Sequence, residues 1–183
     1  KVVVIGAGVS GMNAAAIALG MQAEVVVLDR DIDKLRAADK IYQGHLQTVA
    51  SNAYEVERAV LDADLVIGAV LVAGAKAPVL VSNELVSRMK PGSVLVDIAV
   101  DQGGCFEDTR PTTHDDPTFR VHESVFYCVA NMPGAVPNTS THALTNVTLP
   151  YVMALANEGT TAAVRSNRAL AHGVNVVAGR VVL

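Results

Sequence analysis

Near-continuous apolar runs recur along the chain and alternate with stretches of mixed polarity. Val, Ile and Leu dominate these runs, as is typical of strands that are covered on both faces of a parallel sheet. The runs are KVVVI at 1–5, EVVVL at 24–28, the weaker LQTVAS at 46–51, DLVIGAV at 64–70, SVLVDIAV at 93–100 and VFYCVA at 125–130. Helices are predicted between them, at 10–20, 31–39, 53–61 and 82–90. The pattern therefore predicts an α/β fold with a doubly wound, mainly parallel six-stranded sheet and helices on both faces.

The C-terminal part of the chain follows a different pattern. A Pro/Gly-rich loop leads into Ser and Thr residues that are suited to capping, and then into an apolar helix that we expect to run to about Asn157. Pro150 should kink or break this helix. A further short helix and an apolar tail are predicted from Thr160 onward. We therefore expect a sheet domain over 1–137 and a C-terminal helix and tail over 138–183.

Composition excludes several classes of partner. The 183 residues are 51% hydrophobic and 17% charged, with a net charge of -4, so no basic field is available to attract nucleic acid. No apolar run reaches the roughly 18 residues that a membrane span needs, and no signal peptide is recognisable, which favours a cytoplasmic location. Cys105 and Cys128 lack a CxxC spacing and are interpreted as reduced structural thiols, with Cys128 inside a strand.

A glycine-rich turn follows the first apolar run and precedes the first predicted helix. It has the pattern GxGxxG and consists of Gly6, Ala7, Gly8, Val9, Ser10 and Gly11. The first glycine allows the turn, the second lets the backbone approach a pyrophosphate, and the third allows close packing of helix on strand. The free amides at the helix N-terminus favour an anion there. This context indicates a Rossmann-type dinucleotide-binding domain.

The second predicted strand ends on an acidic residue, as this motif requires. Asp29 can accept hydrogen bonds from the adenosine ribose hydroxyls and would repel a 2′-phosphate, which favours NAD over NADP. Arg30 and Lys34 leave some tolerance of NADP open, because a cation just past this strand can accommodate the 2′-phosphate. Lys34 and Arg36 are equally interpretable as a solvated helix face near acidic residues.

The second half of the chain narrows the class further. The segments GAKAPVLV at 74–81, VDIAVDQGGCFE at 96–107, RPTTHDDPTF at 110–119 and YCVANMPGAVP at 127–137 closely resemble bacterial alanine dehydrogenases. That resemblance implies an enzyme that interconverts L-alanine with pyruvate and ammonia using NAD, in some members also acting on glyoxylate, and that typically forms homohexamers. It covers nearly all of this chain but only the second half of such an enzyme.

The resemblance also implies a missing part. In the family, a substrate domain built mainly from the segment before the glycine turn supplies the Lys, Arg and His that bind the substrate. We therefore expect that Lys1 marks a domain boundary, that residues 138–183 pack against the absent domain, and that this chain alone binds NAD(H) but turns over alanine negligibly.

Asp101 is the candidate catalytic residue. It follows the strand 93–100 at its carboxyl end, where doubly wound folds bind ligands, and Gly103 and Gly104 leave room for a close approach. Its carboxylate could orient the substrate amine, relay a proton during imine hydrolysis, or only cap the loop. The match to the aspartate of alanine dehydrogenases favours the catalytic roles. Asp97, inside the same strand, is interpreted as structural.

Further cofactor contacts are implied by the resemblance. The positions placed around the adenine and ribose are Ser51, Val70 and Leu71, with Lys34 as an adenosine-side cation. The positions placed on the nicotinamide side are Ile98, Asn131 and Met132. Asn131 is alternatively an ordinary turn former. His114 lies in a polar loop, His122 begins a strand, and three further histidines stand alone, namely His45, His142 and His172. No pair has metal spacing, so we expect structural roles for the histidines and no metal.

Two other classes of function stay open. The NAD(H)-binding domain of proton-translocating nicotinamide nucleotide transhydrogenase shares the fold and the glycine turn. A non-catalytic NAD-binding module would share the same cofactor site without any substrate groups.

Overall fold

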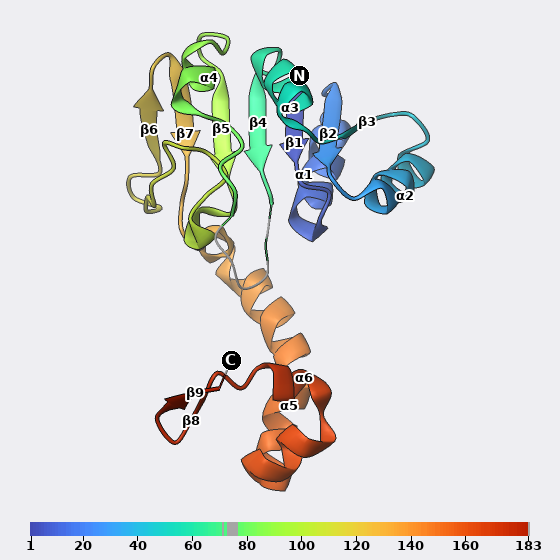
Figure 1. Ribbon diagram of the computed structural model, residues 1–183, viewed down its shortest axis with the longest axis vertical. Helices are drawn as coiled ribbons and strands as arrows, with labels where there is room; N and C mark the ends of the chain where they lie inside the picture. Colours follow the sequence, from blue (N-terminus) through green and yellow to red (C-terminus); the bar gives the residue numbers. More distant parts are fainter. Residues whose placement is uncertain (71, 73–76, 183) are drawn as a thin grey trace. The chain divides into compact units, whose positions relative to one another are not determined.

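A seven-stranded sheet forms the centre of the N-terminal part of the chain (Figure 1). The computed structural model describes residues 1–70, 72 and 77–182. The strand order is β3-β2-β1-β4-β5-β7-β6, and every neighbouring pair is parallel except β6 with β7. The strands are β1 Val2–Ile5, β2 Val25–Asp29, β3 Gln47–Ala50, β4 Leu65–Gly68, β5 Val94–Asp97, β6 Thr118–Val121 and β7 Ser124–Tyr127. The predicted doubly wound α/β fold is confirmed.

The predicted number of strands is wrong by one. All six predicted strands are present, but β6 adds an antiparallel edge strand that the pattern did not indicate. Its sequence TFRV alternates exposed and half-buried residues, because an edge strand has only one neighbour and needs no continuous apolar run. His122, with a positive φ of 51°, turns the chain between β6 and β7. Cys128 lies one residue beyond β7 rather than inside it.

Helices fill the four predicted intervals. They are α1 Val9–Gly20, α2 Ile32–Tyr42, α3 Ala53–Leu61 and α4 Asn83–Ser87. The side chains of Asp31, Asn52 and Ser82 cap α2, α3 and α4 by accepting hydrogen bonds from backbone N–H groups of the first turn. The last helix is shorter than the expected 82–90, because Pro91 disfavours helical dihedrals in the residue before it and Gly92 turns the chain with a φ of 80°.

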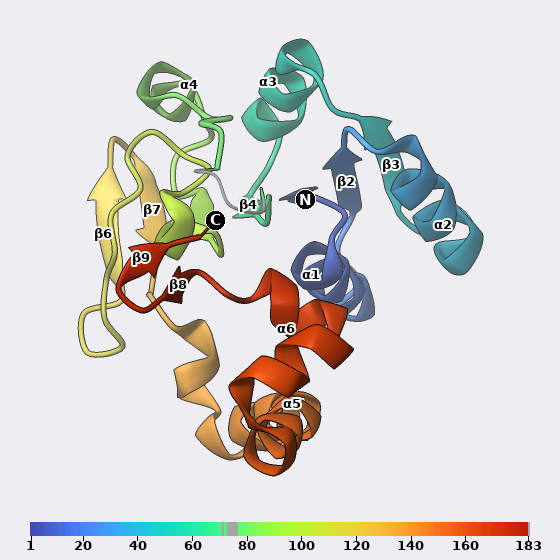
Figure 2. The same cartoon turned by 60° about the horizontal axis from the view of Figure 1, so that its bottom comes forward.

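Each face of the sheet has its own apolar core. Val3 and Ile5 of β1 pack in the cluster that contains residues of α3 and α4, whereas Val2 and Val4 pack in the cluster with α1 and α2. The alternation follows from the two-residue period of a strand. Figure 2 shows α3 and α4 on one side of the sheet and α1 on the other. The central strands are therefore buried on both faces, which explains their unbroken apolar runs.

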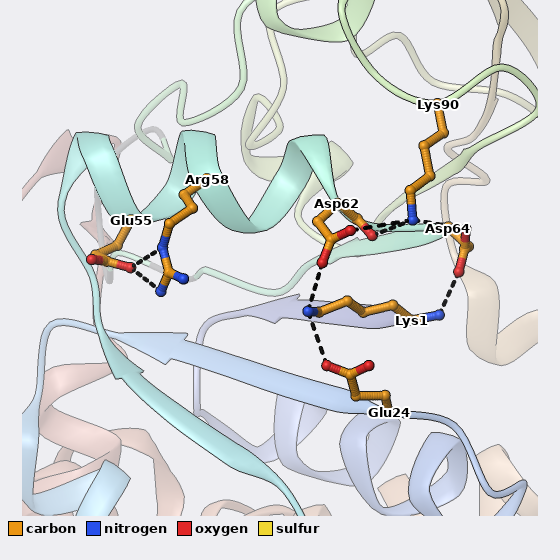
Figure 3. Close-up of polar contacts among 7 residues, drawn as sticks. All are labelled: Lys1, Glu24, Glu55, Arg58, Asp62, Asp64 and Lys90. Carbon is orange, nitrogen blue, oxygen red and sulfur yellow. Dashed lines mark hydrogen bonds and ion pairs between the residues drawn. The ribbon is translucent and has the colours of Figure 1, made fainter.

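Ion pairs cluster where β1, β2, β4 and β5 begin (Figure 3). The Lys1 ammonium lies 2.7 Å from Asp62 and 2.9 Å from Glu24, and the Lys90 ammonium lies 3.5 Å from Asp62 and 3.4 Å from Asp64. The bonds to Asp62 and Glu24 raise the pKa of Lys1. Water screens these exposed groups, so we assign them a small contribution to stability. They lie at the edge opposite the strand ends that carry the predicted site.

The chain divides into two compact units, Lys1–Met132 and Pro133–Leu183. The second contains α5 Pro137–Ser166, α6 Arg168–His172 and a hairpin of β8 Val176–Val177 and β9 Arg180–Val181. Ala178 and Gly179, both with positive φ, form the two-residue turn of this hairpin. Within the described ranges, no helix is both long enough and apolar enough to cross a membrane.

The interruption in α5 lies at a different residue from the predicted one. Helical dihedrals continue through Pro150 and are interrupted at Gly159, where φ is 74° and ψ is 159°. The expectation that Pro150 breaks the helix is therefore wrong. Proline removes one backbone hydrogen bond but keeps a helical φ, whereas glycine can adopt a φ that other residues avoid.

Candidate functional site

The predicted site residues converge on one edge of the sheet, here called the carboxyl edge, where β1, β2, β3, β4, β5 and β7 end. The strand ends are level there, since Ile5 pairs with Gly68 and Gly68 pairs with Asp97. The chain reaches this edge at the glycine turn, Asp29, Ser51, Val70, Ile98, Asp101 and Asn131. Leu71, the remaining adenosine-side candidate, lies outside the described residues. The edge includes the point between β1 and β4 where the strand order reverses, which is where doubly wound folds bind ligands.

Three glycines of the turn face different surroundings. A Cβ on Gly6, whose φ is 111°, would lie 2.6 Å from the carbonyl oxygen of Ala69 beyond β4. A Cβ on Gly11 would overlap the carbonyl oxygen of Gly6. A Cβ on Gly8 would meet nothing within 4 Å. Gly6 and Gly11 are therefore required by packing within the protein, whereas the space at Gly8 is open to a ligand.

The N-terminus of α1 presents free amides to that space. The first hydrogen bond of the helix runs from the Met12 N–H to the Gly8 carbonyl at 2.9 Å. The N–H groups of Val9, Ser10 and Gly11 precede this bond, and Gly8 at the cap position has no side chain to satisfy them. These amides, with the partial positive charge of the helix end, suit a phosphate group.

The carboxylate of Asp29 is held by hydrogen bonds to the glycine turn and to the start of the next helix. Its Oδ2 accepts a hydrogen bond from the Ala7 N–H at 2.6 Å, and its Oδ1 accepts one from the Asp31 N–H at 2.8 Å. Its carbonyl accepts from the Ser51 N–H at 2.8 Å, which brings the end of β3 beside the end of β2. A carboxylate has about four acceptor positions, so two remain for the hydroxyls of a ligand.

The cations near Asp29 lie on an exposed helix face. The Lys34 ammonium is 3.9 Å from Asp31, and the Arg36 guanidinium is 3.1 Å from Asp33, both one turn apart on α2. Arg30 is exposed in the bend before the helix. These pairings favour the solvated-face interpretation of Lys34 over a role in binding the adenosine end.

Asp101 lies at the exposed apex of the segment that follows β5. It is the middle residue of a short 3-10 helix, Val100–Gln102. Ile98 leaves β5 with its N–H bonded to the Gly68 carbonyl at 2.9 Å. Gly103 and Gly104 then return the chain with φ values of 94° and 75°. The Asp101 side chain is therefore exposed at the carboxyl edge.

Asn131 follows β7 in a left-handed conformation, with a φ of 58°. Its carbonyl lies 3.1 Å from Nε2 of His114, and the loop of His114 also bonds to the residue after β7, through the Thr112 N–H and the Cys128 carbonyl at 3.0 Å. Met132 is the next residue and is half-buried. The contact between His114 and Asn131 is not evident from the sequence, because nothing local links His114 to a residue 17 positions away.

Both thiols are buried in the core beside the carboxyl edge. Cys105 and Cys128 are fully buried and unpaired with each other. Burial, and secondarily the negative charge of Asp97, raise the pKa of each thiol to about 11. The prediction that both are reduced structural cysteines agrees with this environment.

Both cysteines are expected to resist alkylation in the native protein at pH 8. A pKa of about 11 leaves roughly one thiol in a thousand ionised at that pH, and burial excludes the reagent. Mass spectrometry after iodoacetamide treatment should find no adduct in the native protein and two in denaturant. Because the folded pKa exceeds the unfolded value, the stabilisation from these thiols is complete below about pH 9 and is lost as the pH rises towards 11. Rapid alkylation of either cysteine in the native protein would contradict the burial of the thiols.

A mainly parallel sheet with a glycine turn at its switch point and an acidic residue ending β2 defines a Rossmann-type dinucleotide-binding domain. The whole chain, residues 1–183, matches the family described as "Alanine dehydrogenase/PNT, C-terminal domain". The chain therefore belongs to that family. Membership and fold support NAD as the cofactor.

Individual relatives and solved structures are consistent with this family membership. The chain is 66% identical over 178 residues to an alanine dehydrogenase of Mycobacterium tuberculosis, which covers 97% of this chain and 48% of the relative. A solved L-alanine dehydrogenase is 50% identical with a TM-score of 0.91, covering 100% of this chain and 50% of that one. A transhydrogenase from Sinorhizobium meliloti is 30% identical with a TM-score of 0.66, covering 76% and 41%. The chain spans about half the length of the curated relatives it matches.

Proposed function

We propose that this chain is the NAD(H)-binding half of an L-alanine dehydrogenase. The reaction converts L-alanine, NAD⁺ and water to pyruvate, ammonium, NADH and a proton. The observation that carries the proposal is Asp101, exposed at the same carboxyl edge of the sheet as the glycine turn, in a chain that is 66% identical to an alanine dehydrogenase.

The residues at the carboxyl edge fit a dinucleotide. The pyrophosphate would be held by the amides of α1 above the open space at Gly8, and Asp29 would accept from the adenosine ribose hydroxyls. The proposed adenosine-side contacts are Ser51, Val70, Leu71 and, less favoured, Arg30 and Lys34. The proposed nicotinamide-side contacts are Ile98, Asn131 and Met132. When bound, NAD supplies the acceptor for a hydride from the substrate.

Asp101 is the proposed catalytic residue. A carboxylate at the nicotinamide side can orient the substrate amine and can relay a proton when water adds to the imine that hydride removal leaves. Its side chain is exposed and makes no hydrogen bond within the described part of the chain, which fits a group kept for a ligand rather than for loop capping. Asp97 performs the capping of that loop instead.

A separate substrate domain is the proposed partner of the C-terminal unit. The long helix α5 of the C-terminal unit carries large apolar side chains that are exposed in this chain. These include Leu144, Val147, Leu149, Val152 and Met153. Apolar surface of this extent favours burial against another domain. We use the term full-length protein for this chain together with the substrate domain that we propose precedes it.

The isolated chain is expected to bind NADH but to show less than about a hundredth of the alanine turnover of the full-length protein, because the proposed substrate domain would carry the groups that clamp the substrate. Isothermal titration with NADH measures cofactor binding, and alanine-dependent NADH formation measures turnover. Turnover near the full-length value would contradict a missing substrate domain. Failure to bind NADH would contradict the cofactor site itself.

Changing Asp29 to asparagine is expected to weaken NADH binding by about tenfold to a hundredfold. It should also reduce the ratio by which the protein binds NADH more tightly than NADPH. An amide oxygen can replace only one of the two acceptors that fix the turn, and the charge that repels a 2′-phosphate is lost. Titration with both cofactors measures the ratio. Asp33→Asn on the exposed face of α2 is the matched control and should change neither affinity. An unchanged ratio would remove Asp29 from cofactor selection.

A transhydrogenase domain is the second candidate function, favoured by the 30% identical structure. Such a domain would bind NAD(H) without an amino-acid substrate, and so would a non-catalytic NAD-binding module. Identities of 53–66% to alanine dehydrogenases over at least 97% of this chain favour the first proposal. Alanine-dependent NADH formation by the full-length protein separates it from both alternatives.

We also propose that the full-length protein is a cytoplasmic homohexamer and that it accepts glyoxylate in addition to pyruvate. The support is the family resemblance of the second half of the chain. Light scattering would give the mass of the assembly, and glyoxylate-dependent NADH oxidation would test the second substrate. A monomeric mass, or no oxidation, would overturn the corresponding proposal.

A further inference from the structure

Asp97, the last residue of β5, holds a fully buried carboxylate with three hydrogen-bond donors. Its Oδ1 accepts from the Ala99 N–H at 3.0 Å. Its Oδ2 accepts from the Cys105 N–H at 2.8 Å and from the Thr109 hydroxyl at 2.5 Å. A buried carboxylate is costly unless it is well bonded, and here neutral donors satisfy it.

The donors lie on either side of Asp101. Ala99 precedes it by two residues and Cys105 follows it by four, so a single carboxylate holds both ends of the segment that carries Asp101. Within the segment, the Gln102 and Gly104 N–H groups both donate to the Ala99 carbonyl, at 2.9 Å and 3.0 Å. The result is a closed loop with Asp101 at its apex.

The loop is packed tightly onto this anchor. A Cβ on Gly104 would lie 2.7 Å from Oδ2 of Asp97 and would collide with the Thr109 side chain. Gly104 also has a φ of 75°, which other residues rarely adopt. The return of the chain from Asp101 is therefore determined by Asp97 and Thr109 together, and a shift of either would move the apex.

We propose that Asp97 and Thr109 are positioning residues that fix the orientation of Asp101 at the carboxyl edge. The inference rests on the proposed function, in which Asp101 is catalytic. Asp97 is fully buried and bonds to both ends of the loop that carries Asp101, so we assign its effect on the reaction to the placement of Asp101. Misplacing a reacting group by about 1 Å can lower a rate about a hundredfold. The glycine turn and Asp29 lie on other strands, so cofactor affinity should be spared.

The test uses the full-length protein and the variants Thr109→Val and Asp97→Asn. We expect kcat to fall by about tenfold for Thr109→Val and about a hundredfold for Asp97→Asn, with the Kd for NADH changed less than about threefold. Thr109→Ser keeps the hydroxyl and should restore kcat. The matched control is Ser93→Ala, which removes the buried 2.7 Å hydrogen bond to Ser124 at the opposite end of β5 and should leave kcat unchanged.

A double-mutant cycle separates positioning from general stability. In an Asp101→Asn background, the Thr109 and Asp97 substitutions should cause little further loss of kcat, because the group that they position is already gone. An equal loss in both backgrounds would overturn positioning while leaving the role of Asp101 intact. Full turnover by Asp101→Asn alone would overturn the catalytic role of Asp101 and the positioning with it, whereas absence of alanine turnover in the unsubstituted full-length protein would overturn the proposed function. If Asp97→Asn does not fold, Thr109→Val with its serine rescue decides the question.

Discussion

Replacing Gly11 with alanine is expected to raise the Kd for NADH at least about a hundredfold and to lower the free energy of unfolding by about 1–3 kcal/mol. The new Cβ would overlap the carbonyl oxygen of Gly6 and lie 3.2 Å from Cγ1 of Val4. A backbone carbonyl cannot rotate away as a side chain can. Either α1 or the turn after β1 must therefore move, and the amides at the start of α1 lose their alignment.

Two other glycines provide the controls. Gly20→Ala, at the end of the same helix, places its Cβ where nothing lies within 4 Å. It should leave the affinity for NADH unchanged and should not lower the free energy of unfolding, since alanine favours a helix over glycine. Gly8→Ala also places its Cβ in open space, so stability should hold, but the methyl group would fill the space proposed for the pyrophosphate. Titration with NADH measures the Kd of each variant, and thermal unfolding measures its stability. Normal NADH affinity in Gly8→Ala would show that the dinucleotide lies elsewhere.

Changing Asp101 to asparagine is expected to lower alanine turnover by the full-length protein by about 10²–10⁴-fold, the range typical for loss of a positioned acid or base. The side chain is exposed at the end of its loop, so folding should be unaffected. The Kd for NADH should change by less than about threefold, because the amides of α1 and Asp29 hold the other end of the cofactor.

Asp115→Asn is the matched control for this substitution, since Asp115 is also an exposed loop aspartate in the same unit. It should leave turnover unchanged. Steady-state kinetics with alanine and titration with NADH distinguish a chemical role from a binding role. Full turnover by Asp101→Asn would mean that the Asp101 carboxylate has no part in the reaction, and the alanine dehydrogenase proposal would lose its catalytic residue.

Much of the sheet could be predicted because its central strands are buried on both faces. β1, β2 and β4 are apolar throughout their interior positions, and a run of this kind is visible without any knowledge of neighbours. The edge strand β6 and the hairpin of β8 and β9 carry no such signal, since each has one partner strand and exposed residues. Their pairing comes from turns and neighbours rather than from composition.

The fold class, the glycine turn and the acidic end of β2 could be predicted from the sequence, because each depends on residues within a few positions or at a fixed spacing. The groups that hold that site together became evident only from the packing of distant segments. Ala69 restricts Gly6, and Asp97 joins Ala99, Cys105 and Thr109 around Asp101. These contacts cross between strands and loops. Such contacts produce no periodic pattern in the sequence, because each residue is required by an atom from a distant segment and not by its neighbours along the chain.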